Sequence, residues 1–206
     1  MSIEIKKSIK PVNYLDAIDF LEKRITKIIR NNADELIWIL EHPSIFTAGT
    51  SFNENDILDK SIDIVKTSRG GKITWHGPGQ LIFYFVINLN NKKKDIRKFI
   101  NIVEKSIITS LKKFEIHSYS DRENIGIWIK KNDVERKVGA IGIRIKKWIA
   151  YHGFSLNISN DIINYKKIIP CGIKNKDVVT LKEINNQNYN DLPDEIINNF
   201  ISNLKI

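Results

Sequence analysis

The sequence predicts an α+β fold in which helices flank a sheet of hairpin-connected strands. Segments with helical spacing of apolar residues are set among runs of strand character and do not alternate strictly with them, which disfavours a doubly wound parallel sheet. Lys131, Asn132 and Asp133 are typical of a hairpin turn between two of these runs. A chain of 206 residues has the length of one domain, and we expect that domain to span residues 1–206.

Three segments carry the apolar spacing of helices packed on a core. Residues 13–31 place apolar side chains on one face, with Asn13 as the N-cap. Residues 95–115 repeat apolar residues in steps of three or four, with Asp95 as the cap. Residues 193–204 begin with a proline, which the first turn of a helix tolerates well. We therefore expect one helix near each end of the chain and one near its middle.

Apolar, β-branched runs predict the strands, at residues 36–40, 62–67, 81–87, 125–129, 134–145 and 148–158. Pro43 ends the first of these, because proline cannot donate to the ladder. A polar loop is expected from there through Thr47, Ala48 and Gly49. A second loop, rich in glycine and proline, is expected at residues 69–80.

Composition limits the partners and the compartment. The net charge is +9 and the pI is about 9.5, which attracts acidic partners such as nucleic acid, anionic lipid or acidic proteins; a general lysine bias of the source is the other interpretation. Residues 1–13 carry no apolar signal region and no run of about eighteen apolar residues exists, so we expect a cytoplasmic protein that spans no membrane. The single cysteine, Cys171, can form no internal disulfide and no cysteine-type zinc site.

The glycine-rich loop is the most unusual segment. Residues 69–80 hold five glycine and proline residues, in a chain with ten glycines and five prolines in all. Such a loop adopts an unusual backbone or lets a ligand approach closely, and Arg69, Thr74, His76 and Gln80 add side chains that can act on it. The loop matches neither GxxxxGK[ST] nor GxGxxG, and the histidines lack metal-ligand spacing. We expect no metal and no cofactor.

Three further residues are candidates for chemistry. Cys171 lies between Pro170 and Gly172, and it is either a small buried hydrophobe or a nucleophile that a nearby cation converts to the thiolate. Lys137 stands in a strand with two glycines, where it either faces solvent or serves the cysteine. His152 is either a core histidine with satisfied hydrogen bonds or a second candidate cation.

Four blocks, in this order, resemble the lipoyl(octanoyl) transferase family. They are Arg69-Gly70-Gly71 with Thr74-Trp75-His76-Gly77-Pro78-Gly79-Gln80, Lys137-Val138-Gly139-Ala140-Ile141-Gly142, His152-Gly153 with Leu156-Asn157, and Pro170-Cys171-Gly172. Glu41-His42-Pro43 fits the family more weakly. The spacing of 34 residues between Lys137 and Cys171 (171 − 137) also agrees with the family. The likeness runs from about residue 36 to residue 181.

The resemblance implies a biotin/lipoate protein ligase-like catalytic domain, with a mixed, largely antiparallel sheet and helices outside it. It implies transfer of an octanoyl group from octanoyl-acyl carrier protein to a lysine of the lipoyl domains of 2-oxoacid dehydrogenases or of the glycine cleavage H protein, the first step of protein lipoylation. Cys171 is implied as the acyl-accepting nucleophile of a thioester intermediate, and Lys137 as its partner. The residues implied to bind substrate are Arg69, Gly70, Gly71, Lys72, Ile73, Thr74, Trp75, His76, Ala140, Ile141, Gly142, Gly153, Phe154 and Ser155. We expect a monomer.

Three other functions remain open on sequence alone. An ATP-dependent lipoate or biotin protein ligase has the same fold but needs no nucleophilic cysteine. A basic nucleic-acid-binding module would explain the charge, although the lysines and arginines are scattered and no recognised motif is present. A cysteine hydrolase would place His76 or His152 beside Cys171. The leading interpretation predicts protein partners and neither nucleic acid nor membrane.

Overall fold

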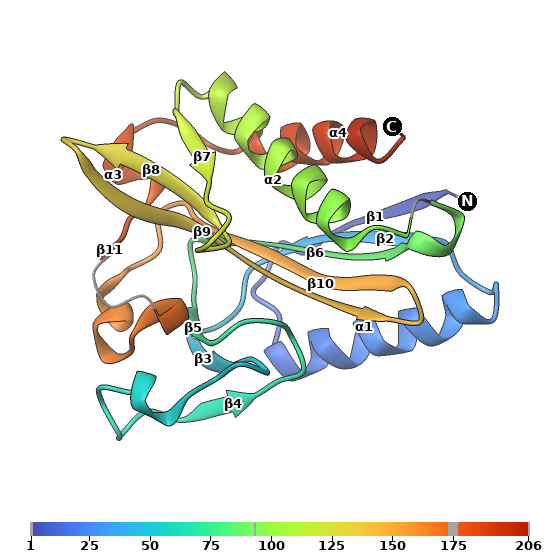
Figure 1. The fold of residues 1–206 in the computed structure, drawn as a ribbon, viewed down its shortest axis with the longest axis horizontal. Coiled ribbons are helices and arrows are strands. Elements are labelled where there is room, and N and C mark those ends of the chain that lie inside the picture. Colours follow the sequence, from blue (N-terminus) through green and yellow to red (C-terminus); the bar gives the residue numbers. More distant parts are fainter. Residues whose placement is uncertain (1, 93, 173–176, 206) are drawn as a thin grey trace.

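An eight-stranded sheet forms the centre of the structure, and helices lie on both its faces (Figure 1). The computed structural model describes residues 2–92, 94–172 and 177–205, without the side chains of Asn91 and Cys171. The strands of this sheet are β1 (Ile3–Lys7), β2 (Glu35–Leu40), β6 (Gln80–Asn88), β7 (Ser118–Ser120), β8 (Ile127–Lys131), β9 (Val134–Lys146), β10 (Ile149–Asn157) and β11 (Asp177–Val178).

The sheet is mixed and largely antiparallel, which confirms the predicted fold class. Its order is β1-β2-β6-β10-β9-β8-β7, and β11 pairs with β9. Only the β1/β2 and β11/β9 pairs are parallel among the described strands of this sheet. The β8–β9 hairpin turns at Asn132 and Asp133, both with positive φ, where the sequence predicted a turn.

A second, three-stranded sheet lies on the same side as the first helix (Figure 1). It consists of β3 (Ile45–Ala48), β4 (Ile64–Lys66) and β5 (Ile73–His76), in the order β4-β3-β5. The loops contain short 3-10 helices: η1 (Glu54–Asp56), η2 (Leu89–Asn91), η3 (Ile163–Lys167) and η4 (Pro170–Gly172).

Two of the helices begin at the residues that the sequence predicted as caps. Helix α1 (Tyr14–Ile29) starts after Asn13, whose Oδ1 accepts the main-chain N–H groups of the first turn. Helix α2 (Ile96–Lys113) starts after Asp95, which accepts the N–H of Lys98. The short α3 (Leu181–Ile184) has a capping box, and α4 (Leu192–Leu204) ends the described chain. None of the described helices is long and apolar enough to cross a membrane.

The main core lies between the sheet and the α2–α4 layer, and a smaller one lies under α1. Phe85 of β6 stacks on Phe200 of α4, with their ring centres 5.5 Å apart, and Phe99 of α2 packs edge-on against both. Strand β6 is buried along its whole length because both faces of the sheet are covered there. This double cover explains why the sequence shows a continuous apolar run and no alternation.

Five short strands differ from the sequence prediction. The segment through Thr47 and Ala48 was predicted as a polar loop but forms β3, and Ile73–His76 forms β5 inside the predicted glycine-rich loop. Strands β1, β7 and β11 were not predicted at all. These strands are short, carry polar residues and gain stability from pairing with distant segments, which local patterns do not report.

Candidate active site

Residues 68–72 pack over the open edge of β9 and form one wall of the site. The pairing of β8 with β9 ends at Gly139, so the described strand beyond that point has β10 as its one neighbour. The Arg144 guanidinium donates to the first carbonyl of the loop at 2.8 Å. An added Cβ at Gly142 would come within 3.2 Å of the Gly70 carbonyl oxygen, so these glycines allow the loop and the strand to approach backbone to backbone.

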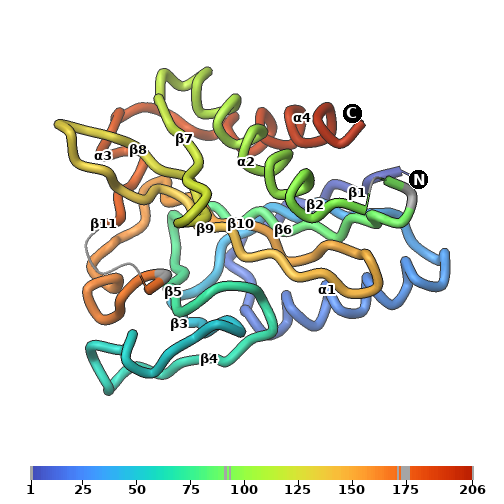
Figure 2. Tube along the Cα trace, in the orientation of Figure 1, coloured from blue at the N-terminus to red at the C-terminus, as the bar shows by residue number. Residues whose placement is uncertain are grey.

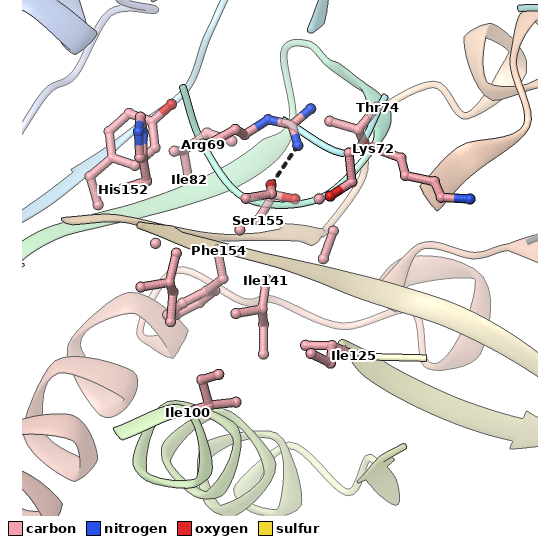
Figure 3. Close-up of a pocket in the computed structure, with 18 of the residues that line it drawn as sticks. Arg69, Lys72, Thr74, Ile82, Ile100, Ile125, Ile141, His152, Phe154 and Ser155 are labelled. Atoms are coloured by element: carbon pink, nitrogen blue, oxygen red, sulfur yellow. Dashed lines mark hydrogen bonds between the residues drawn. The ribbon is translucent and has the colours of Figure 1, made fainter. Parts of the chain in front are cut away.

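A cavity of about 400 Å³ lies between this loop, β9, β10 and α2. Its polar wall carries Arg69, Thr74 and Ser155, while its other wall is made of isoleucines and Phe154 (Figure 3). The volume is in the range of small-molecule sites, which is roughly 300–1,000 Å³. A polar wall beside an apolar one suits a substrate with a reactive head and a hydrocarbon tail.

Most residues predicted to bind substrate line this cavity: Arg69, Gly70, Gly71, Lys72, Thr74, His76, Ala140, Ile141, Gly142, Gly153, Phe154 and Ser155. Ile73 and Trp75 do not. They alternate with the cavity residues along β5 and pack into a separate apolar cluster with Phe46. Sequence reasoning also missed Ile96 and Ile100 of α2, which line the cavity, because their helical spacing assigned them to the core.

Lys137 is buried beside the cavity, with 5% of its surface exposed, so the interpretation as a solvent-facing lysine is wrong. Its Nζ donates to the Ile125 carbonyl at 2.9 Å and lies 5.2 Å from the centre of the Trp128 ring. Within the described residues, no carboxylate forms an ion pair with it. Lys137 also lines a smaller cavity of about 10 Å³, whose wall includes Pro170. The ammonium therefore keeps hydrogen-bonding capacity for a group that enters next to Pro170.

The backbone of the Cys171 segment is tied down on both sides. Before it, the N–H of Ile169 donates to the Asp56 carbonyl at 2.8 Å; after it, the N–H of Val179 donates to the Lys137 carbonyl at 3.0 Å, and Val178 pairs with Lys137 in the β11–β9 ladder. Strand β11 lies beside β9 (Figure 2), and Pro170 and Lys137 line one small cavity. The Cys171 side chain lies outside the described residues.

Two histidines under the loop have their protonation states set by hydrogen bonds. His42 Nδ1 donates to the Val12 carbonyl at 2.7 Å, so its Nε2 accepts from the Tyr84 hydroxyl at 2.9 Å. Burial lowers the pKa of His42 to about 4. Burial, with the nearby His42 and Arg69, lowers the pKa of His76 to about 3. Both rings are therefore neutral at physiological pH.

Gln80 joins His76 to the neighbouring strands. Its side-chain NH₂ donates to Asn157 Oδ1 and to the Tyr165 hydroxyl, both at 2.9 Å. Its Oε1 therefore faces His76 Nδ1, at 2.7 Å, and accepts from it. The lone pair of His76 is then on Nε2. Gln80 and Asn157 belong to the sequence blocks noted above, but their role as a buried hub appears only in three dimensions.

His152 is not the satisfied core histidine that the sequence allowed. It is buried, neither ring nitrogen has a hydrogen-bond partner among the described residues, and its φ is +67°. Burial, followed by the charges of Arg69 and Arg144, lowers its pKa to about 3. Its ring lines the cavity. A buried polar group without partners and a left-handed backbone each cost stability, and such features concentrate at functional sites.

Arg69 carries a half-buried positive charge at the cavity wall. Its guanidinium donates to the Thr47 carbonyl at 2.7 Å, to the Thr47 hydroxyl at 2.9 Å and to the Gly70 carbonyl at 3.0 Å. All of these acceptors are neutral, and the buried Nε has no partner in the part of the chain that the structure describes. Three cationic side chains therefore line the cavity among the described residues, Arg69, Lys72 and Lys137, and it is suited to a ligand that develops negative charge.

Known proteins are similar to this chain in sequence. The profile of the lipoyl protein ligase A/B catalytic domain matches residues 13–203. The octanoyltransferase of Wolbachia sp. subsp. Brugia malayi (strain TRS) is 47% identical over 174 residues, which covers 84% of this chain and 85% of that protein. The octanoyltransferase of Bartonella bacilliformis is 41% identical over 192 residues, covering 88% and 80%. These relatives confirm the predicted acyltransferase class and its octanoyl transfer.

Solved structures share its fold. A chain from the structure of a bi-partite lipoate protein ligase and its E2 lipoyl domain from Thermoplasma acidophilum superposes with a TM-score of 0.75 at 13% identity, covering 100% of this chain and 85% of that one. A lipoate-protein ligase A bound with ATP gives 0.73 at 13% identity, covering 98% and 86%. At these identities the likeness shows the fold alone. With the profile and the sequence relatives, it leads to one conclusion: the chain belongs to the lipoyl protein ligase A/B catalytic domain family.

Proposed function

We propose that this chain takes its octanoyl group from the phosphopantetheine thioester of octanoyl-acyl carrier protein and passes it to a lysine of lipoyl domains through an acyl-enzyme on Cys171. The observation that carries the proposal is Lys137. Its ammonium is buried, has neutral partners among the described residues, and borders both the substrate-sized cavity and the cavity next to Pro170. A cation in that position stabilises a thiolate on the adjacent residue.

The first step is thioester exchange. The Cys171 thiolate attacks the octanoyl carbonyl, a new S–C bond forms, and the bond to the phosphopantetheine sulfur breaks. The departing thiolate takes a proton from the Lys137 ammonium and leaves as a thiol. Because one thioester replaces another, the step needs no ATP. Arg69 and the main-chain N–H groups of the glycine-rich loop are the candidates for holding the oxyanion.

The second step forms the amide. The neutral amine of the acceptor lysine attacks the Cys171 thioester and loses a proton to the Lys137 amine, while Cys171 departs as the thiolate. Both residues return to their starting states. The octanoyl tail lies against the apolar wall of Ile100, Ile141 and Phe154. Each buried methylene contributes about 0.8 kcal/mol, so this wall supplies much of the donor affinity.

The geometry disfavours a cysteine hydrolase that uses His152 as its base. His152 pairs with Ile143 in the β10–β9 ladder, six residues along β9 from Lys137 (143 − 137). At about 3.3 Å per residue this is roughly 20 Å of strand. The other candidate base, His76, has its Nδ1 hydrogen-bonded to Gln80.

The proposed acyl-enzyme is tested by the intact mass of the protein after incubation with octanoyl-acyl carrier protein. We expect one octanoyl adduct without ATP, no adduct in Cys171→Ala, and an adduct that forms about 100-fold or more slowly in Lys137→Met. An adduct that persists in Cys171→Ala would falsify the nucleophile assignment. Transfer that requires ATP and free octanoate would instead identify a ligase, and faster release of octanoate than of octanoylated lipoyl domain would identify a hydrolase.

The net charge supports protein partners that are acidic. A basic enzyme attracts an acidic carrier protein at long range, and salt screens that attraction. We expect kcat/KM for the carrier-bound donor to fall as salt rises, with little change for a small uncharged octanoyl thioester used as the control. Equal salt dependence of the two donors would remove this explanation of the charge.

A further inference from the structure

Lys72 places a second ammonium group against the Cys171 segment. An added Cβ at Gly172 would collide with the Nζ, Cδ and Cε atoms of Lys72, so the end of this side chain lies directly on Gly172. Gly172 is the residue that follows Cys171 and has a φ of +69°. In Figure 3 the Lys72 side chain extends away from Arg69, with its ammonium at the outer side of the drawn residues. Lys72 and Lys137 therefore both approach the Cys171 segment, but they belong to different parts of the chain.

The position of Lys72 is fixed by its main chain. Its carbonyl accepts the N–H of Gly49 at 3.1 Å, and the carbonyl of the preceding Gly71 accepts the N–H of Ser51 at 3.1 Å. The side chain is half-buried, and no carboxylate forms an ion pair with it in the described parts of the chain. The main chain of Lys72 is therefore fixed, and its half-buried ammonium has no acidic partner in the described parts of the chain. The positive charge of Lys72 acts on η4.

We propose that Lys72 is a positioning cation for the nucleophile, which stabilises the Cys171 thiolate together with Lys137. The inference rests on the proposed acyl-enzyme, because that mechanism requires a thiolate at Cys171. Lys72 need not touch the substrate to act in this way. Its charge acts through the thiolate, so its removal should change the reactivity of the free enzyme before any donor binds.

Other ionisable groups on the elements around η4 limit the size of the effect. Lys137 lies on β9, Tyr165 on η3 and His76 on β5, while Asp56 of η1 is the acid whose carbonyl binds Ile169. An opposite charge within about 4–6 Å shifts a pKa by about 1–3 units, and partial exposure to solvent reduces this. We expect the charge of Lys72 to lower the titration midpoint of the Cys171 thiol by roughly half a unit to one unit.

The single cysteine makes the test specific, because a thiol reagent can alkylate this chain only at Cys171. The rate of alkylation by iodoacetamide is measured against pH for the full chain and for Lys72→Met, which keeps the length of the side chain and removes its charge. Lys72→Arg restores the charge. Lys27→Met, at an exposed position on α1, lowers the net charge by the same amount far from the site.

We expect Lys72→Met to move the midpoint of the pH profile up by roughly half a unit to one unit, which slows alkylation at pH 7 by about 3- to 10-fold. Lys72→Arg should restore the profile, and Lys27→Met should leave it unchanged. A midpoint in Lys72→Met equal to that of the full chain overturns the proposal. So does an equal shift in Lys72→Arg, since packing and not charge would then be responsible. If the unmodified chain forms no octanoyl adduct but Lys72→Met still shifts the midpoint, the result would count against the acyl-enzyme and not against the role of Lys72.

Discussion

Three of the four histidines should make the folded state sensitive to mild acid. An unfolded histidine has a pKa of about 6.5. Burial holds the pKa of His42 at about 4 and those of His76 and His152 at about 3. Below pH 6.5 the unfolded chain therefore binds protons that the folded chain does not. The stability that comes from these groups is complete above pH 6.5 and falls as the pH drops from there toward 4.

The size of the effect follows from this difference. At pH 5 each unfolded histidine gains about 2 kcal/mol relative to its buried form, since one pKa unit corresponds to about 1.4 kcal/mol. Three such groups together give a loss of about 6 kcal/mol between pH 7 and pH 5. The whole stability of a domain is typically about 5–15 kcal/mol, so the protein should be close to unfolding at pH 5.

Urea unfolding at pH 7, 6 and 5, followed by the fluorescence of the four tryptophans, measures this loss. His152→Asn keeps a residue that accepts a positive φ and removes the titrating ring, so about one third of the pH dependence should disappear. A loss of less than about 2 kcal/mol from pH 7 to pH 5 in the unmodified chain would refute the reasoning, because even one buried neutral histidine requires that much.

Three substitutions test the scaffold, each by its urea midpoint or Tm. Gly153→Ala should destabilise by about 3 kcal/mol or more, since φ is +157° and the new methyl group would collide with a β6 carbonyl; wild-type stability would contradict the described backbone. Gln80→Ala should cost about 2–4 kcal/mol, because it leaves the buried His76 N–H without its acceptor and removes two further buried hydrogen bonds, to Asn157 and Tyr165; a cost below about 1 kcal/mol would count against the hub. Phe200→Ala should cost about 3–5 kcal/mol, whereas Leu58→Ala, on the surface, should stay within about 0.5 kcal/mol; equal effects would contradict the described core.

The central elements were predictable because local pattern and tertiary role agree in them. The cap of α1 at Asn13 and the apolar run of β6 carry their own signals. The signal of β5 was also present, since Ile73 and Trp75 alternate with polar residues, but the surrounding glycines and prolines indicated a loop. Period-two alternation inside such a segment is the feature that could have found it.

Most residues that line the cavity were predictable, but their hydrogen-bonded arrangement was not. The resemblance named Lys137 and Cys171, and the structure adds that Lys137 is buried and that the Cys171 segment is tied to its backbone. The sequence could not predict the hydrogen bond between His42 and Tyr84. Nor could it predict that the His152 ring has no hydrogen-bond partner among the described residues. Both depend on which strand lies beside β6 and β10, and a single sequence does not report that pairing.

The ladder between β11 and β9 has a consequence for how this enzyme can evolve. The residue that presents the ammonium, Lys137, also holds the chain after Cys171 through its own carbonyl group. When β9 shifts, Lys137 and the chain paired with it are therefore carried together. Drift in the surrounding side chains can then alter affinity or partner choice while the separation of Lys137 from the proposed nucleophile segment is set by the main chain. Such a scaffold can change its substrate without rebuilding its chemistry.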